Sequence, residues 1–140
     1  MTGARAAFDD LSAVRDPGAA AGMAAEALRA VNRLTIAAPS PGTPGWKEVG
    51  DLYRVLGELC LVVDRLPQAV DQLRRHLERS AAAGRFRADA GTRDNPERLV
   101  ASAAASLGAA QADARQVGSQ LAAAHSAVAH LAPAHSHRRA

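Results

Sequence analysis

Few side chains in this sequence combine the residue types and spacings that chemistry at a site requires. Cys60 is the single cysteine, and no histidine follows it three or four positions later to activate its thiol on a helix. His76, His125 and His130 are isolated, and the spacing of five between the last two points their imidazoles in different directions. We expect structural roles for these residues, with no metal site and no bound cofactor.

Two further patterns also argue against catalysis. His135 and His137 lie near the C-terminus, where a flexible pair lacks the fixed geometry that gives affinity for a metal. Acidic residues recur seven apart with arginines nearby, which indicates solvated ion pairs. They are Asp51 with Glu58, and Asp64 with Asp71. The chain contains no glycine loop for phosphate, no serine nucleophile motif and no HExxH helix, so we expect no enzymatic activity and no small-molecule substrate.

One group of basic residues is a candidate contact for nucleic acid. The net charge is only +3, and most basic residues are interleaved with acidic ones. The arginines that gather toward one region are Arg74, Arg75, Arg79, Arg85, Arg87 and Arg93. They could contact phosphates, but no recognition-helix motif or aromatic side chain accompanies them. An accessory nucleic-acid-binding protein is therefore an alternative to our preferred interpretation.

The strongest pattern is a pair of apolar runs whose spacings alternate between three and four, as is typical of helical seams. The first run comprises Val49, Leu52, Leu56, Leu59, Val63, Leu66, Val70, Leu73 and Leu77. The second comprises Val100, Ala103, Leu107, Ala110, Ala114, Val117, Leu121, Ala124, Val128 and Leu131. Two runs of nearly equal length predict a long antiparallel, coiled-coil-like hairpin in which bulky residues of the first arm pack against alanines of the second.

Breakers and capping residues place the helix boundaries. A shorter first helix is expected over residues 18–38, before a linker rich in proline and glycine at 39–45. Thr43 and Pro44 suit the start of a middle helix over 44–83, and Gly84 suits its C-terminal cap. Asn95 and Pro96 open a last helix over 96–132. Residues 1–17 and 133–140 are expected to be flexible segments, so the helical domain spans 18–132.

Pro67 lies inside the middle helix. A proline there removes one backbone hydrogen bond and clashes with the carbonyl four residues earlier. The apolar spacing continues through Pro67 without losing phase, and two separate helices would be free to lose it. We therefore predict a kink and not a break.

The middle helix is apolar on more sides than one partner helix can cover. Val55, Leu61 and Val62 lie outside the expected seam, and Gly50 and Gly57, seven residues apart, would let another backbone approach. The last helix exposes mainly alanine and serine. These faces predict self-association, or association with another helical protein.

Composition sets the class and the compartment. Alanine-rich sequence with 3% aromatic residues favours close helix packing, and arginine outnumbers lysine sixteen to one, which fits a GC-rich, actinomycete genome. A single cysteine allows no intrachain disulfide, and no long apolar run or secretory signal is present. We expect a cytoplasmic protein without a membrane partner.

The stretch from Trp46 to Gln68, WKEVGDLYRVLGELCLVVDRLPQ, together with the alanine-rich last helix, resembles small uncharacterised helical proteins of actinomycete plasmids and integrative elements. The resemblance covers about two thirds of the chain and implies no activity. A cruder likeness is to the helical-hairpin substrates of type VII secretion, which carry a Trp-x-Gly turn. Here Lys47 and Glu48 follow Trp46, and no Tyr-x-x-x-Asp/Glu signal follows the hairpin.

The sequence thus predicts an all-α three-helix bundle, in which a short first helix accompanies a long antiparallel hairpin. Its expected role is that of a non-enzymatic structural or protein-interaction module that associates with itself.

Overall fold

The computed structural model describes residues 13–36 and 49–131, which form three helices and no strand. This confirms the all-α class. The helices are α2 (Pro17–Ile36), α3 (Val49–Ala82) and α4 (Pro96–Val128). The chain divides into two units, Met1–Trp46 and Lys47–Ala140, and the division falls just after the segment rich in proline and glycine. No helix in the described part of the chain has the length and apolar character needed to span a membrane.

Helix α2 begins with a capping arrangement that the sequence pattern did not single out. Asp16 is the N-cap, and its carboxylate accepts hydrogen bonds from the backbone N–H groups of Gly18 and Ala19 at 3.2 and 3.0 Å. Pro17 occupies the first helical position, where its missing N–H leaves no partner unsatisfied. The helix therefore starts one residue before the expected position, and residues 37 and 38 lie outside the described part of the chain.

Helix α3 ends at Ala82, one residue before the expected position, and the predicted cap at Gly84 is confirmed. Gly84 has φ of 65°, and its N–H donates to the carbonyl of Ala81 at 2.9 Å, while the N–H of Arg85 donates to Ser80 at 3.0 Å. This pair of bonds is a Schellman motif, which satisfies the last carbonyls of a helix. The expected start at residues 43–48 lies outside the described residues.

Helix α4 begins as predicted but ends earlier. The side chain of Asn95 accepts from the N–H of Arg98 at 2.8 Å, and Pro96 follows the cap. The helix ends at Val128, where the backbone tightens into turns that bond His130 to Ala127 and Leu131 to Val128. The expectation of one rod through residue 132 was therefore wrong for its last turn, and Leu131 is no part of a helical seam.

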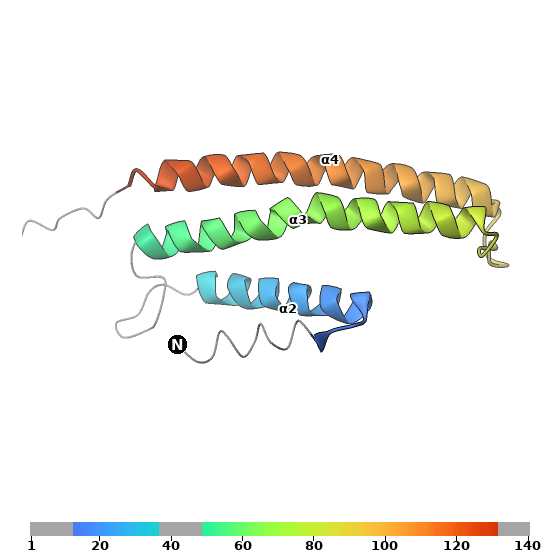
Figure 1. The fold of residues 1–140 in the computed structure, drawn as a ribbon, viewed down its shortest axis with the longest axis horizontal. Coiled ribbons are helices and arrows are strands. Elements are labelled where there is room, and N and C mark those ends of the chain that lie inside the picture. Colours follow the sequence, from blue (N-terminus) through green and yellow to red (C-terminus); the bar gives the residue numbers. More distant parts are fainter. Residues whose placement is uncertain (1–12, 37–48, 132–140) are drawn as a thin grey trace, which may run out of the picture. The chain divides into compact units, whose positions relative to one another are not determined.

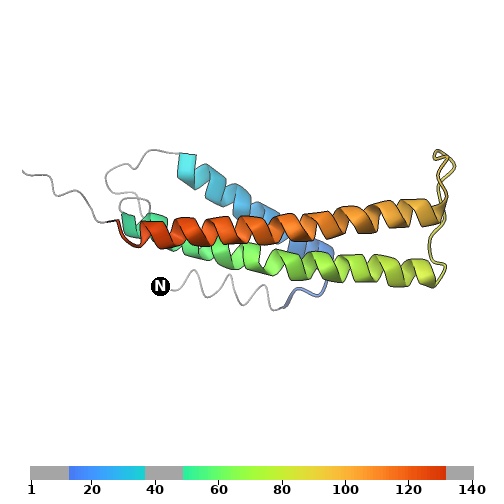
Figure 2. The ribbon, with the colours of Figure 1, turned by 90° about the horizontal axis from the view of Figure 1, so that it is seen from above.

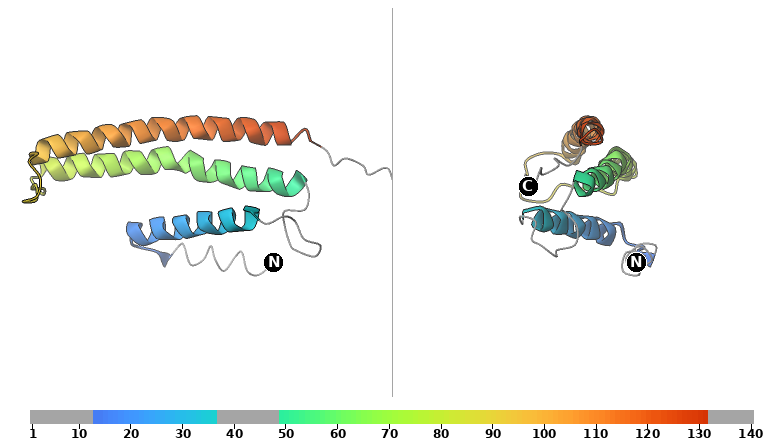
Figure 3. Two further views of the ribbon diagram at one scale, coloured as in Figure 1. Left: turned by 180° about the vertical axis from the view of Figure 1, so that it is seen from behind. Right: turned by 90° about the vertical axis from the view of Figure 1, so that its left-hand side faces the viewer.

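Helices α3 and α4 form the predicted antiparallel hairpin. They lie side by side along their length and run in opposite directions, as both Figure 1 and Figure 2 show. The connection between them lies at one end of the pair (Figure 3). Within it, the Asp89 side chain accepts from the N–H groups of Gly91 and Thr92 at 3.0 and 3.1 Å, which fixes a tight turn.

Pro67 lies within a continuous helix, so it does not break α3. The ribbon of α3 changes direction near its middle (Figure 1), as expected where a proline removes one rung of the hydrogen-bond ladder. The predicted kink without a break is confirmed.

The line of α3 residues that faces α4 matches the expected seam at alternate positions only. At the other positions, the residue facing α4 is the next one along the chain. Val63, Val70 and Leu77 are half-buried as expected, but Leu66 and Leu73 are 44% and 59% exposed. Their places toward α4 are taken by Pro67 and Arg74. The prediction was therefore correct for Val63, Val70 and Leu77 and wrong for Leu66 and Leu73.

Helix α4 shows the same shift. Leu107, Ala114 and Leu121 are half-buried as expected, whereas Ala110, Val117 and Ala124 are exposed. The half-buried or buried residues at the alternate positions lie one place later along the chain. They are Ala104, Gln111, Gly118 and His125. The helices therefore meet through positions that include polar and small residues, and not through the most apolar string available.

The hairpin buries no apolar side chain. Among the described residues, the only buried ones are Ser80 and Gly118. Two helices have only one shared face, so every apolar residue between them remains open to solvent on at least one side.

Replacement of Gly84 by alanine tests the cap of α3. The left-handed backbone at Gly84 disfavours any side chain, so we expect Gly84→Ala to lower the free energy of unfolding by about 1 kcal/mol. Gly108 is the matched control, because a Cβ there would meet nothing within 4 Å and α4 is helical at that point. Gly108→Ala should raise stability by about 0.8–1 kcal/mol, since alanine is the better helix former. Thermal melts followed by circular dichroism measure both, and equal effects would contradict the assigned cap.

Candidate interaction surface

The faces of α3 and α4 that meet each other are held by specific contacts near the ends remote from the turn. The ring of Tyr53 stacks on the imidazole of His125 with centroids 4.0 Å apart and an angle of 24° between the planes. A Cβ on Gly57 would come within 3.2 Å of Nε2 of His125. Gly57 thus admits the imidazole of the neighbouring helix, and this close approach occurs within the hairpin.

A second close approach occurs at Gly118 of α4. A Cβ at this buried position would lie 3.2 Å from Oδ1 of Asp64 and 3.7 Å from Cγ1 of Val63. The absence of a side chain at Gly118 therefore lets α3 approach, as small residues do where helices pack closely.

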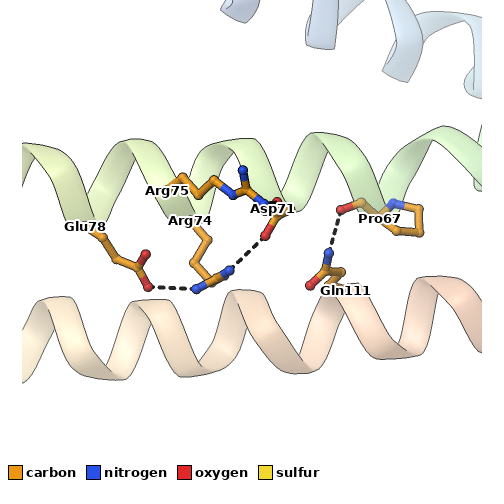
Figure 4. Close-up of polar contacts among 6 residues, drawn as sticks. All are labelled: Pro67, Asp71, Arg74, Arg75, Glu78 and Gln111. Atoms are coloured by element: carbon orange, nitrogen blue, oxygen red, sulfur yellow. Dashed lines mark hydrogen bonds and ion pairs between the residues drawn. The ribbon is translucent and has the colours of Figure 1, made fainter.

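A hydrogen bond crosses between the helices at the kink. The side-chain amide of Gln111 donates from Nε2 to the backbone carbonyl of Pro67 at 3.1 Å, and Figure 4 shows Gln111 reaching across from α4. A backbone carbonyl has two lone pairs, so it can accept this bond in addition to one within its own helix. This bond fixes the register of the two helices, because sliding by one turn would remove it.

An ion-pair cluster follows on α3. Asp71 pairs with Arg74 and with Arg75, each at 2.8 Å, and Arg74 also pairs with Glu78 at 2.9 Å (Figure 4). The hydrogen bond from Arg74, together with the nearby charge of Arg75, holds the pKa of the Asp71 carboxyl below its usual range. The cluster neutralises charges that lie beside the interface with α4.

The shift of the interface leaves a second line of apolar residues on α3, which we name the outer seam. It comprises Leu52, Val55, Leu59, Val62, Leu66, Ala69 and Leu73. Its spacings also alternate between three and four. With 3.6 residues per turn, it lies about a third of the helix circumference away from the line that faces α4.

The outer seam is partly open. Val62, Leu66 and Leu73 are 42%, 44% and 59% exposed, while Leu52 and Leu59 are half-buried. The sequence pattern concealed this line, because its leucines also fit the expected seam. The signal that could have revealed it is that Val55, Val62 and Ala69 continue the same alternation with those leucines.

Helix α4 borders the outer seam with small side chains. Equivalent heptad positions of two antiparallel helices flank the same side of the pair, so Ala103, Ala110, Val117 and Ala124 lie on the side to which the outer seam of α3 turns. Three of these four residues are exposed. Together the two lines form an apolar face that fits the docking of another helix.

The structure separates the candidate interaction residues of the sequence analysis. Val55 and Val62 belong to the outer seam, whereas Leu61 is 50% exposed on a different side of α3. Gly57 lies against α4, and a Cβ on Gly50 would meet nothing within 4 Å.

The six arginines proposed as nucleic-acid contacts do not form one free group. Arg74 and Arg75 are engaged in the ion-pair cluster with Asp71. The others, Arg79, Arg85, Arg87 and Arg93, are exposed and make no ion pair with the described residues. None of these four arginines lines the hollow of about 680 Å³ between the end of α3 and the start of α4, whose lining includes Glu78, Phe86 and Glu97.

The remaining chemical candidates are scattered. Cys60 is a half-buried free thiol, and the described residues contain no group of three His, Cys, Asp or Glu side chains that could hold a metal ion. His135 and His137 lie outside the described residues. No protein-family model, curated protein or solved structure matches this chain.

Replacement of Gln111 tests the contact across the hairpin. Glutamate keeps the size of the side chain but removes the donor, so Gln111→Glu turns a carboxylate toward the carbonyl of Pro67. We expect it to lower the free energy of unfolding by about 1 kcal/mol at neutral pH. Gln120→Glu, at an exposed position of α4, is the control and should have little effect. Equal melting temperatures for the two variants would show that the contact does not hold the helices.

The Asp71 cluster predicts a specific dependence of stability on pH. Its carboxyl has a lower pKa in the folded chain than in the unfolded chain, so the folded state binds the proton less tightly. The stabilisation is therefore complete above the ordinary carboxyl pKa and is lost as the pH falls through the lowered value. Asp71→Asn should melt below the wild type at pH 7, and the difference should vanish in strong acid. Asp113→Asn, at an exposed position of α4 that makes no ion pair with the described residues, should show no such convergence.

Proposed function

We propose that this chain is a non-enzymatic structural or protein-interaction module that associates with itself through the outer seam and the small-residue face of α4. The observation that carries the proposal is that a regular apolar line on α3 remains partly exposed while no apolar side chain of the described residues is buried. Large exposed apolar faces on helices mark surfaces that bind other helices.

The energetics favour a partner for this face. Complete burial of one Leu or Val side chain stabilises by about 1.5–3 kcal/mol relative to exposure. Val62, Leu66 and Leu73 each retain roughly half of their surface, so a packed neighbour could recover part of that amount at each position. The outer seam and the charged residues beside it on α3 therefore suit contact with another helix.

The proposal also assigns the protein to a cellular compartment, the cytoplasm. A lone thiol such as Cys60 stays reduced in the cytoplasm, and we place the module there.

Light scattering of the full chain after gel filtration, over a range of concentrations, tests self-association. We expect a species larger than the monomer, which Leu66→Glu should convert to the monomer because it places a charge in the outer seam. Leu61→Glu is the matched control, since Leu61 has similar size and exposure on the same helix but lies outside the seam. Circular dichroism should show unchanged helix content in both variants.

Two results would contradict the proposal. A wild-type chain that stays monomeric at all concentrations would remove self-association. Equal dissociation by Leu61→Glu and Leu66→Glu would show that the outer seam is not the surface used.

A further inference from the structure

We infer that the occupant of the outer seam is the same seam of a second copy, with the two α3 helices antiparallel across a two-fold axis. This inference rests on the proposed self-association and specifies its geometry. Most symmetric dimers use the same patch on both copies, so the patch must complement itself. The outer seam meets that condition in both its apolar and its charged residues.

The apolar residues of the outer seam interlock when one copy is reversed. The outer seam has two alternating sets of positions, the leucines and the smaller residues between them. In an antiparallel coiled coil, one set packs against the other set of the partner helix. With the axis near the centre of the seam, Leu59 packs against Val62 of the partner subunit. In the same register Leu66 meets Val55 of the partner subunit, and Leu52 meets Ala69 of the partner subunit. Larger leucines thus face smaller valine or alanine at each level.

Charged residues that flank the seam fix this orientation. Glu58 and Arg65 lie seven residues apart on the stripe of α3 next to the outer seam, and neither has an ion-pair partner among the described residues. Flanking residues of this kind pair with their equivalents in an antiparallel coiled coil. In the register given above, Glu58 comes opposite Arg65 of the partner subunit, and the two-fold axis repeats the pair. A parallel dimer would instead bring like charges to the same level.

Helix α4 leaves room for this arrangement. The residues of α4 beside the outer seam are Ala103, Ala110, Val117 and Ala124, which are small. A second hairpin can therefore approach closely, and two hairpins would form a four-helix bundle around the two α3 helices.

A second copy fits the seam better than α2 does. The apolar positions of α2 are mostly alanine, and its Glu26 and Arg29 already pair with each other at 2.9 Å. They offer no free complement to both Glu58 and Arg65. A second copy brings those same two charges in reversed order.

Charge exchange in the full chain tests the register. Glu58→Arg turns both symmetry-related ion pairs into pairs of arginines. Arg65→Glu turns both into pairs of glutamates. Each variant alone should raise the dimer dissociation constant by about tenfold. Mixing the two variants should restore wild-type affinity in a heterodimer, and so should the double exchange in one chain. A purely intrachain effect would not be repaired by mixing.

Cysteine cross-linking tests the orientation independently. In a Cys60→Ala background, chains carrying Glu58→Cys should cross-link to chains carrying Arg65→Cys when they are mixed and oxidised. Neither variant should cross-link with itself, because identical residues lie far apart in this register. The two positions are too distant within one helix to bridge each other.

The outcomes separate this inference from the proposed function. A monomer in all conditions, as would follow if α2 covered the seam, overturns both. A dimer that Leu66→Glu dissociates, but in which each cysteine variant links to itself and mixing restores nothing, overturns the antiparallel register and leaves self-association through the outer seam in place.

Discussion

A hairpin of two helices has one internal interface, and each helix can turn only one face toward it. Helix α3 carries apolar residues on more of its circumference than that face covers, and α4 offers mainly alanine in return. The hairpin therefore lacks a buried apolar core in the part of the chain that the structure describes. Its exposed seam and the case for a partner follow from this geometric limit.

Polar contacts decide which face of α3 turns inward. The Pro67 carbonyl, the rings of Tyr53 and His125 and the missing side chain of Gly118 each need one particular alignment of the helices. Apolar contact alone would allow the helices to rotate or slide by a turn at little cost, since leucine and alanine recur along both. Directional contacts remove that freedom, while the leucines remain available for another surface.

Much of the fold could be predicted from local signals. Asn95, Pro96 and Gly84 mark helix ends because caps and left-handed residues act through neighbouring backbone groups, and the hairpin follows from two apolar runs of similar length. The phase of the interface could not be predicted in the same way. Leu66 and Leu73 fit two different lines on α3, and the choice between the lines depends on Gln111, Gly118 and His125, which lie far away in the sequence. The resemblance to helical proteins of actinomycete plasmids stays a prediction.

The turn between α3 and α4 joins the hairpin covalently at one end only. Contacts between the helices can form first beside the turn and then extend along the pair, because residues beside the turn are close in the sequence. The opposite end, which includes Tyr53 and His125, closes last and would fray first under thermal motion. Much of the outer seam lies toward that open end. A docked helix would therefore stabilise the hairpin at the end where no turn joins α3 to α4.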